Sequence, residues 1–523
     1  MVALPRRQVC QGVVVFRLLG LLGGLAAVTD LGTGSAADES LRRCVVATRL
    51  ARAAGCDDDE VRRVVYVSLL EHIGCTAYSY ESARVWGDDI SSTRLAFLMD
   101  TEDPRDVFRV WVPGLSAATG RSPARVLMTT VRSMRTVDAN GPVATCEVAT
   151  EAARRLGLSE SVRRALHDVL TMWNGSGYPR RGGAEIPIAT RIMHVAAVAV
   201  LFLLHAGRAA AVREVVRRSG THLDPELADL LATEADDLLA GIEEVDAYEA
   251  ALGCEPDPVR LIDHPDLAEV ARTFGDLVDL KDPWLHGHSA AVAELASAAV
   301  AGLGLAGEVE AVRVAGHLHD VGRAGVSSRI WAKAEPWSAS ERDQARLHPY
   351  HSERVLARVP ELAGAARLAG QHHERCDGSG YHRGLTGDRM AMSSRVLAAA
   401  DAYRALVETR PGSAALPPSA AVSQLRTEAR SGTLDGDAVE AVVAAAGQES
   451  RTSRVRPAGL TSRQVEVLRL VASGMSNRQI AERLVISRRT AEHHVQDVYT
   501  KIGASTRAGA ALFAMEHGLL GKT

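Results

Sequence analysis

Aromatic side chains and paired cysteines are scarce in this sequence of 523 residues. Aromatic residues make up 4% of the chain, with only six Phe, whereas Ala, Leu and Val are abundant, which favours helices over sheets. The seven Cys are scattered and form no CxxC pair, so they indicate reduced thiols in a cytoplasmic protein rather than a disulfide framework. The composition therefore predicts an all-α protein.

Long hydrophobic runs are also few. The apolar stretch at 13–28 is interrupted by Arg17 and by three Gly, and it is shorter than the roughly 20 apolar residues that span a bilayer. We expect a buried, amphipathic first helix there rather than a cleaved signal, and no membrane partner. Hydrophobic residues nevertheless amount to 46% of the chain, which excludes a disordered protein.

The formal net charge of −4 is small, but the charge is unevenly distributed. From Arg451 to Thr523, 12 Lys and Arg oppose five Asp and Glu, an excess of +7 that leaves −11 for the rest of the chain. A basic terminal module on an acidic body is typical of a nucleic-acid-binding tail. The length predicts about three domains.

The body contains two similar halves. Three pairs of segments match in the same order: 50–75 with 298–323, 174–192 with 377–396, and 219–231 with 431–443. Ordered matches of this kind indicate a duplicated domain, each copy a helical bundle. A proline-containing joint is expected at 247–265 and a polar, Arg-rich linker at 448–458. The predicted domains are 1–250, 262–448 and 456–523.

Half of the 18 His fall between 286 and 382. These His and nearby Asp residues lie on different predicted helices or helix ends, and side chains from separate helices can build a two-metal cage in a bundle core. Imidazole and carboxylate suit Fe, Mn, Zn or a similar divalent metal. The candidate ligands are His288, His319, Asp320, His348, His372, His373 and Asp401.

The segment from about 266 to 445 resembles the HD-GYP family of HD-superfamily phosphohydrolases. The resemblance rests on five ordered motifs: GHSAAV (287–292), HLHDVGRAGV (317–326), RLHPYHSERVL (346–356), QHHERCDGSGY (371–381) and SSRVLAAADAYRAL (393–406). It implies that the seven candidates bind two metal ions, with Asp320 bridging, and that the domain hydrolyses cyclic di-GMP. It also assigns catalysis to Asp320 and Arg323, and substrate contacts to Arg323, Asp377, Gly380, Tyr381 and Arg404.

Four positions depart from the family pattern. Arg323 replaces the Lys that follows the HD pair, and His382 replaces the Pro of the Gly-Tyr-Pro tripeptide. Trp284 stands where members with a third metal carry Glu, which favours two metals. Arg404 replaces a second Asp and is expected either to stabilise Asp401, to contact phosphate, or to be a solvated or ion-paired residue.

The first copy has lost the ligands. Carried through the repeat, His288 corresponds to Ser40, the His319-Asp320 pair to Glu71-His72, the His372-His373 pair to Val169-Leu170, and Asp401 to Ala197. Aliphatic side chains cannot bind a metal, so this copy is predicted to be catalytically inactive, with a structural or dimerisation role favoured over a sensory pocket. Cys75 corresponds to Arg323 and is expected to be buried and inert rather than a redox sensor.

The tail, 460–520, shows short amphipathic helices punctuated by Gly474 and Ser487. Segments 477–484 and 488–501 have helix-turn-helix proportions. The tail resembles the LuxR-type DNA-binding domain over its whole length, which implies that the second helix enters the major groove of a DNA duplex, usually as a dimer. The candidate DNA-binding residues are Asn477, Arg488, Arg489, Thr490, His493, His494, Gln496 and Lys501.

Together these features predict a cytoplasmic, homodimeric transcriptional regulator with tandem HD-type bundles, the second a metal-dependent phosphodiesterase. The alternative is a transcription factor whose body binds a nucleotide without significant hydrolysis. The complete ligand set favours the enzyme, and the changed residues Arg323 and His382 favour the sensor.

Overall fold

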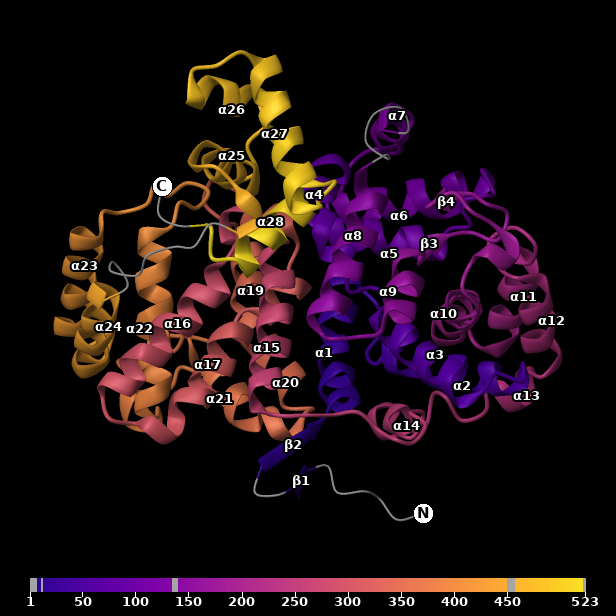
Figure 1. Cartoon of the computed structure of the whole chain (residues 1–523), viewed down its shortest axis with the longest axis horizontal. Helices are drawn as coiled ribbons and strands as arrows, with labels where there is room; N and C mark the ends of the chain where they lie inside the picture. Colours follow the sequence, from indigo (N-terminus) through magenta and orange to yellow (C-terminus); the bar gives the residue numbers. More distant parts are fainter. Residues whose placement is uncertain (1–6, 11–12, 134–139, 449–456, 521–523) are drawn as a thin grey trace. The chain divides into compact units, whose positions relative to one another are not determined.

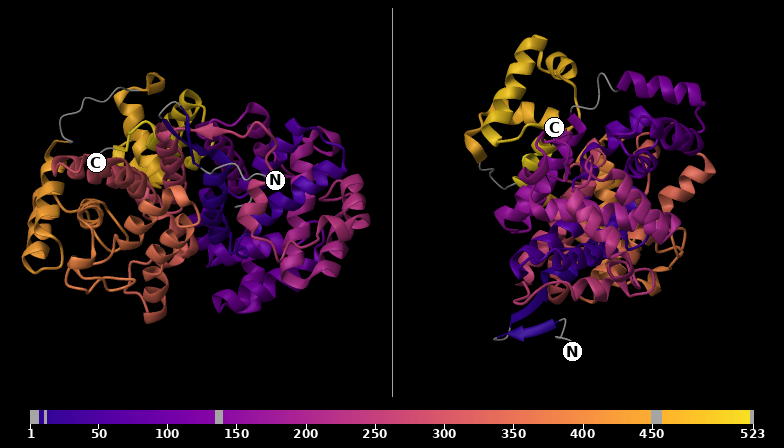
Figure 2. Two further views of the ribbon diagram at one scale, coloured as in Figure 1. Left: turned by 90° about the horizontal axis from the view of Figure 1, so that it is seen from below. Right: turned by 90° about the vertical axis from the view of Figure 1, so that its right-hand side faces the viewer.

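The computed structural model describes residues 7–10, 13–133, 140–448 and 457–520, and helices are by far the main secondary structure of the described chain (Figure 1). Its residues form two compact units, Met1–His264 and Pro265–Thr523. Both consist mainly of helices, as two further views show (Figure 2). The all-α prediction is confirmed. Residues 449–456 of the expected linker lie outside the described residues.

Unit 1 is a helical bundle with short strands at its margins. Its helices are α1 (Leu18–Thr33), α2 (Glu39–Ala53), α3 (Asp58–Leu70), α4 (Ser79–Trp86), α5 (Asp89–Leu98), α6 (Val112–Thr119), α7 (Pro123–Ser133), α8 (Asn140–Arg155), α9 (Glu160–His167), α10 (Ile188–Ala206), α11 (Arg208–Arg218), α12 (Pro225–Thr233), α13 (Ala235–Leu238) and α14 (Ala247–Leu252). Its strands are β1 (Arg7–Cys10), β2 (Val13–Arg17), β3 (Leu170–Thr171), β4 (Gly177–Tyr178) and β5 (Leu261–Ile262).

The first apolar stretch is only partly helical. Residues Val13–Arg17 form β2, which pairs antiparallel with β1 and with β5, and α1 begins at Leu18. The expected helix at 13–28 is therefore wrong for its first five residues, where three consecutive Val and a Phe favour a strand. From Leu18 onward the helix is buried on nearly all sides rather than amphipathic.

Helix α10 forms the centre of unit 1. It packs against α2, α3 and α11, and its 19 residues are long and apolar enough to cross a membrane by length and composition alone. Two thirds of its most apolar window, 67%, is buried inside the protein, as in the core helix of a bundle.

Unit 2 contains a second bundle and a smaller C-terminal group of helices. The bundle comprises α15 (His264–Asp279), α16 (His288–Gly302), α17 (Val309–Leu318), α18 (Ser328–Trp331), α19 (Ala339–Arg346), α20 (His348–Leu356), α21 (Ala363–Gln371), α22 (Met392–Val407), α23 (Pro418–Arg430) and α24 (Gly436–Gln448). The C-terminal group comprises α25 (Ser462–Ala472), α26 (Asn477–Leu484), α27 (Arg488–Ile502) and α28 (Arg507–Glu516).

Several internal contacts of unit 1 recur in unit 2. Arg191 pairs with Asp224 at 2.6 Å, and Arg395 pairs with Asp435 at 2.9 Å. The backbone N–H of Trp173 donates to the carbonyl of His222 at 3.0 Å, as that of Cys376 does to Thr433 at 2.9 Å. These contacts make Trp173 equivalent to Cys376 and Arg191 equivalent to Arg395. The same two sequence offsets make Val169 equivalent to His372 and Ala197 equivalent to Asp401.

A close helix approach also recurs. A Cβ on Gly74 would lie 2.1 Å from the carbonyl oxygen of Thr145, and one on Gly322 would lie 2.1 Å from that of His348. Only Gly permits such an approach. The match places Gly74 with Gly322, Glu71-His72 with the HD pair, and Thr145 with His348.

One correspondence taken from the sequence is wrong by one residue. The Ser40 hydroxyl donates to Asp30 at 2.5 Å, and the Ser289 hydroxyl donates to Asp279 at 2.8 Å, in both cases ten residues earlier in the chain. Ser40 therefore corresponds to Ser289, and Glu39 is the counterpart of His288. The sequence anchors begin only at residue 50, so they could not fix the register of the preceding turn.

Candidate metal centre and nucleic-acid interface

The seven candidate ligands come together in unit 2 from the ends of four helices and the middle of a fifth. His288 opens α16 and His348 opens α20, whereas the HD pair follows α17 and the His372-His373 pair follows α21. Asp401 lies within α22. All are buried except His373, whose side chain is 22% exposed. Helix ends thus bring together residues that lie up to 113 positions apart in the sequence.

Three groups of these residues have ligand atoms within 4.8 Å of one another. Two groups share no residue, and the third contains a member of each. The groups are His288, His319 and Asp401; His348, His372 and His373; and His319, Asp320 and His372. In the part of the chain that the structure describes, these are the groups that could hold a metal ion.

Asp320 lies between the two separate groups. Its Oδ1 is 3.2 Å from Nε2 of His348 and 3.5 Å from that of His372. Its Oδ2 is 3.6 Å from Nε2 of His319 and 4.0 Å from that of His288. Each carboxylate oxygen therefore faces one group, which is the arrangement of a carboxylate that bridges two ions.

Backbone carbonyls orient three of the imidazoles. Nδ1 of His319 donates to Gly316 at 2.8 Å, and Nδ1 of His348 and His372 donate to carbonyls three residues earlier at 2.6 and 2.5 Å. Since these bonds use the Nδ1 protons, each Nε2 carries a lone pair that faces the centre.

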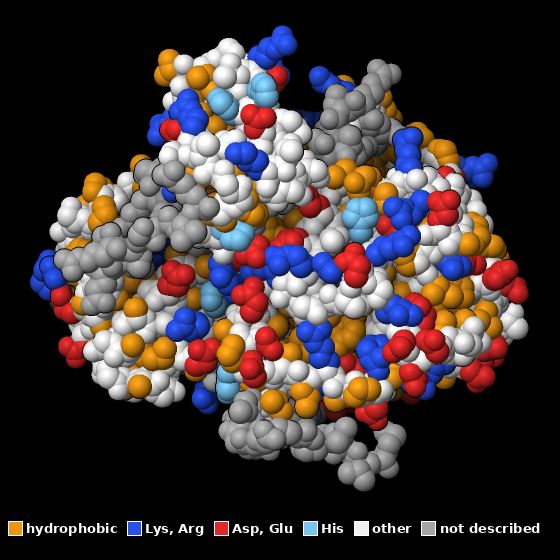
Figure 3. Space-filling view, in the orientation of Figure 1, with side chains coloured by type: hydrophobic (Ala, Val, Ile, Leu, Met, Phe, Trp, Pro, Cys, Tyr) orange, Lys and Arg blue, Asp and Glu red, His pale blue; other side chains and the backbone are white. Residues whose placement is uncertain are grey.

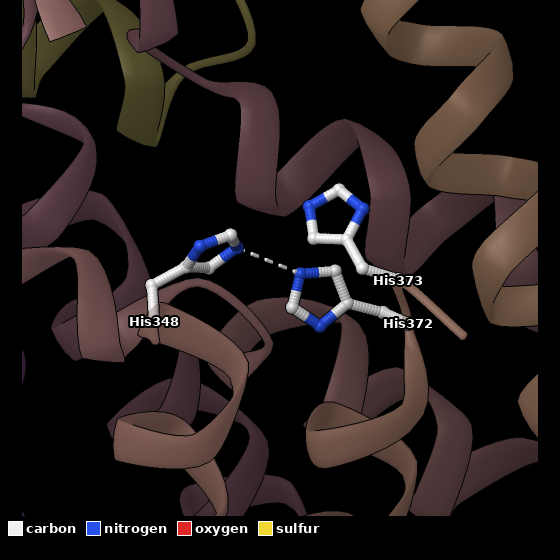
Figure 4. Close-up of side chains that lie close together, drawn as sticks. All are labelled: His348, His372 and His373. Carbon is white, nitrogen blue, oxygen red and sulfur yellow. Dashed lines mark hydrogen bonds between the residues drawn. The ribbon is translucent and has the colours of Figure 1, made fainter. Parts of the chain in front are cut away.

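Figure 4 shows the result for His348 and His372, whose Nε2 atoms lie 3.2 Å apart, with His373 beside them. Two lone pairs at this distance repel each other unless a cation or a proton lies between them. Nε2 of His288 and of His319 and Oδ1 of Asp320 are buried and have no hydrogen-bond partner among the described residues. This donor set fits divalent metal ions.

Glu408 supports the site and was missed in the sequence. Its Oε2 accepts from Nδ1 of His288 at 2.8 Å, and its Oε1 accepts from Nε of Arg404 at 3.2 Å. Arg404, predicted to contact Asp401 or phosphate or to be ion-paired, thus holds Glu408. No motif marks residue 408, and only its spacing of four residues from Arg404 hints at the pair.

The electrostatics of the centre favour ionised carboxylates. Burial disfavours the charge of Asp320 and Asp401, but the surrounding imidazoles, together with Arg323 at Asp320, outweigh burial and hold both pKa values well below 3.8. Burial lowers the pKa of His319 to about 4. At His288 burial is outweighed by Glu408 and Asp401, which raise its pKa to about 10. The field there favours positive charge.

Arg323 is buried beside the centre. Its Cζ lies 3.7 Å from the centroid of the Trp331 ring, and its nitrogens lie 3.7 Å from Asp320 and 3.6 Å from Asp282. The guanidinium is thus stacked and ion-paired, and it contributes positive charge next to the bridging carboxylate.

The loop after His373 contains three of the predicted substrate residues. Tyr381 stacks on His373 with ring centroids 4.8 Å apart, so it borders the centre. Asp377 accepts from the backbone N–H of Ser379 at 2.9 Å, and a Cβ on Gly380 would lie 2.4 Å from the backbone nitrogen of Arg375. Asp377 and Gly380 therefore shape the loop.

The C-terminal helices present one polar face. Ser476 caps α26 in a capping box, and Ser487 caps α27 by accepting from the N–H of Thr490 at 3.1 Å. Arg488, Arg489, His493 and Gln496 are exposed along α27, and Arg488 pairs with Glu492 at 2.9 Å. The first turns of this helix carry the side chains expected to reach DNA.

Three of the predicted DNA contacts stabilise the domain itself. Besides Thr490 at the cap, Asn477 accepts from Arg507 at 2.8 Å, and Nζ of Lys501 donates to the side chain of Gln464 at 2.9 Å. His494 is half-buried.

Elsewhere on the molecule, the face shown in Figure 3 has Lys and Arg side chains among Asp and Glu.

Two family models match the chain. An HD domain matches residues 272–438, and the luxR family of bacterial regulatory proteins matches residues 458–514. A 3'3'-cGAMP-specific phosphodiesterase 3 of Vibrio cholerae is 27% identical over 410 residues, 77% of this chain and 89% of the relative. Its similarity extends beyond the matched HD domain.

Further relatives match one part of the chain each. A cyclic di-GMP phosphodiesterase of Thermotoga maritima is 33% identical over 148 residues, 28% of this chain and 40% of the relative. The transcriptional regulatory protein MctR of Rhizobium johnstonii is 41% identical over 63 residues, 12% of this chain and 29% of the relative.

A solved structure shares the fold. A crystal structure of cyclic GMP-AMP-specific phosphodiesterase from Vibrio cholerae aligns with a TM-score of 0.58 at 23% identity, covering 83% of this chain and 98% of the other. With the two family matches, it follows that this chain carries an HD domain, similar to those of cyclic-dinucleotide phosphodiesterases, joined to a C-terminal helix-turn-helix domain of the luxR family.

Proposed function

We propose that the HD domain is a two-metal phosphodiesterase that opens cyclic dinucleotides, and that the same chain binds duplex DNA through α27. The observation that carries the enzymatic part is the position of Asp320, whose two oxygens face two separate groups of buried ligands. A structural histidine cluster has no need of such an arrangement. Iron and manganese are the metals that we favour for this mixed imidazole and carboxylate set.

Divalent metals at such a centre supply Lewis acidity toward a phosphate group and toward water. The chain itself holds the ligands in place through the Nδ1 hydrogen bonds and Glu408. Arg323 steadies Asp320 from the side, and Tyr381 borders the centre on His373, where a purine ring or a phosphate of the substrate can meet it. Asp377 and Gly380 contribute to substrate binding by fixing the loop that carries Tyr381.

The substrate that we propose is cyclic di-GMP. The alternative substrate is 3'3'-cGAMP, because the relative that matches most of this chain is named as specific for it. Metal-loaded protein is incubated with each dinucleotide and the linear products are separated by chromatography. The control is the double variant His319→Ala/Asp320→Ala, which removes one residue of the group His288, His319 and Asp401 together with the carboxylate that faces both separate groups. Wild-type turnover no greater than that of the control for both substrates would refute the phosphodiesterase.

The second candidate is a transcription factor that binds a nucleotide without hydrolysis. Two observations favour it: Arg323 is stacked on Trp331 rather than extended toward a substrate, and His382, which replaces the family's Pro, has its Nε2 3.7 Å from a carboxylate oxygen of Glu353. Binding of intact cyclic dinucleotide to wild-type protein, with neither substrate turned over, identifies this function.

The DNA-binding part rests on the exposed face of α27. We expect duplex binding that weakens steeply with salt, because each phosphate neutralised by Lys or Arg releases counterions. The double variant Arg488→Ala/Arg489→Ala should reduce the slope of log affinity against log salt by about two. Arg426→Ala, an exposed ion-paired residue of α23, is the matched control. Equal slopes for all three proteins would exclude groove docking by α27.

A DNA partner also implies a cytoplasmic protein, and DNA-binding modules of this type usually act on paired half-sites, so we propose a homodimer. Light scattering of the full chain with and without duplex measures its oligomeric state. A monomer in both conditions would count against it.

A further inference from the structure

Unit 1 contains a cavity of about 490 Å³. Its lining includes Glu71, His72, Val169, Leu170 and Ala197, the residues that correspond to metal ligands of unit 2. The cavity therefore occupies the place of the lost metal centre. Its volume falls in the range of small-molecule binding sites.

Most of the wall is apolar or aromatic. Phe97 forms one side, and its ring stacks on His72 with centroids 4.6 Å apart and an interplanar angle of 10°. Further apolar lining comes from Met99, Met172, Tyr178, Val198 and Leu201, among others. A flat, apolar ring would make close contact with such a surface.

The charged residues of the wall already have opposite charges beside them. Glu39 pairs with Arg94 at 2.9 Å, and Glu71 pairs with Arg43 at 2.8 Å. In these pairs, a guanidinium group supplies the positive charge that a metal ion would otherwise supply beside a buried carboxylate. A strongly charged ligand would have to break them at the cost of leaving a buried charge uncompensated.

Arg218, a further cation of the wall, is 1% exposed and is also engaged. Its Nη2 donates to the carbonyl of Leu98 at 2.9 Å, and its Nε lies 3.6 Å from Glu214. The cavity thus presents hydrogen-bonding atoms but little net charge.

Three imidazoles supply the polar atoms. Burial lowers the pKa of His72, His194 and His222, so all three are neutral at pH 7. His194 is hydrogen-bonded to the carbonyl of Val169 at 2.8 Å. Nδ1 of His72 is buried and has no hydrogen-bond partner among the described residues. A buried polar atom without a partner costs free energy that a ligand group could recover.

We propose that this cavity binds a small, neutral, planar ring molecule that places one hydrogen-bonding group against His72, so that unit 1 is a sensory domain. The apolar wall with its stacked Phe97 and His72 rings favours a planar ring, and the paired charges disfavour an anion such as a cyclic dinucleotide. The unpartnered Nδ1 of His72 would bind the polar group of the ligand. This inference does not depend on hydrolysis in unit 2.

The test uses the full chain and calorimetric titration with 2-naphthol, a neutral two-ring alcohol, and with 2-naphthoate, its anionic analogue. We expect 2-naphthol to bind at least about tenfold more tightly, because the anion must be desolvated without a free cation to receive it. No binding of 2-naphthol, or tighter binding of 2-naphthoate, overturns the proposal.

Two variants locate the site. Ala197→Trp fills the cavity and should abolish 2-naphthol binding, whereas Ala206→Trp, exposed on the same helix, should leave it unchanged. If Ala197→Trp fails to fold by circular dichroism, His72→Phe decides, since it keeps the stacking on Phe97 and removes the polar edge. We expect it to weaken 2-naphthol about three- to tenfold. Undiminished binding in folded Ala197→Trp, or in His72→Phe, refutes the site.

Discussion

Glu408→Gln is the sharpest test of the metal centre. The substitution keeps an oxygen that can accept from Nδ1 of His288 but removes the negative charge 2.8 Å from that nitrogen. The carboxylate is well placed to be ionised: burial opposes its charge, but His288, Arg404 and Arg410 outweigh burial and lower its pKa to about 2.

The magnitude follows from the change in the hydrogen bond. A bond to a charged group is worth about 1.5–3 kcal/mol and a neutral bond about 0.5–1.5 kcal/mol. The difference of roughly 1.4 kcal/mol corresponds to a tenfold loss, in line with the 10–100-fold effects of residues that orient metal ligands. Glu408→Ala, which removes the acceptor, is expected at the upper end of that range.

The assay is metal retention by the full chain during dialysis against a graded series of chelator concentrations, with the metal quantified by plasma mass spectrometry. Glu440→Gln is the matched control, because that carboxylate is 58% exposed and paired with Arg426 at 2.7 Å away from the centre. Retention by Glu408→Gln within about twofold of wild type would show that Glu408 does not act through His288.

Three other substitutions test local physical reasoning. Burial raises the pKa of Asp30 from 3.8 to about 7, so between these pH values the folded protein binds more protons than the unfolded protein. The free energy of unfolding therefore falls by about 1.4 kcal/mol per pH unit as the pH rises through this range. Asp30→Asn should remove this pH dependence, measured as amide hydrogen exchange in α1 and α2. Val485 has φ 54° and is 90% exposed, so Val485→Gly should raise exchange protection of α26 and α27 by about 1 kcal/mol, and lowered protection would contradict the strain. Arg323→Lys, which loses the stack on Trp331, should lower the free energy of unfolding in urea by about 1–2 kcal/mol, and an unchanged midpoint would count against that contact.

The candidate metal ligands could be selected from the sequence because their positions are tied to helix ends. His288 and His348 each begin a helix, and the HD and His372-His373 pairs each follow one, so local pattern and family motif point to the same residues. Spacing alone could not show that they converge. The structure adds this, together with the orientation of Asp320 between two groups.

Other features depend on contacts that no local pattern encodes. Glu408 is 120 residues from His288, and its role exists only because the end of α22 packs beside the start of α16. The strand β2 needs its partners β1 and β5, the latter far along the chain. The pairing of Glu39 rather than Ser40 with His288 emerges only from the hydrogen bond between Ser40 and Asp30.

The two bundles supply positive charge to their buried carboxylates in different ways. A buried carboxylate requires positive charge nearby. In unit 2, imidazoles, Arg323 and a site fit for cations surround Asp320 and Asp401, whereas in unit 1 guanidinium groups pair with Glu39 and Glu71. If Arg43 is the permanent substitute for a metal at Glu71, its removal must leave a buried charge uncompensated.

Arg43→Ala should therefore destabilise unit 1 by about 3–5 kcal/mol, the usual cost of breaking one partner from a buried pair. Arg43 is 1% exposed, and its Nε also donates to the carbonyl of Ser68 at 2.8 Å, so its removal also takes this donor away from that carbonyl. The double variant Arg43→Ala/Glu71→Gln should recover part of the loss, because it removes the stranded charge. The free energy of unfolding of all these variants is measured by urea titration. Arg62→Ala is the control: because its partner Asp59 is 77% exposed, the substitution should lower the free energy of unfolding by less than about 1 kcal/mol. A loss for Arg43→Ala no larger than that for Arg62→Ala would show that the guanidinium does not compensate Glu71, and the analogy between ion pair and metal would fail.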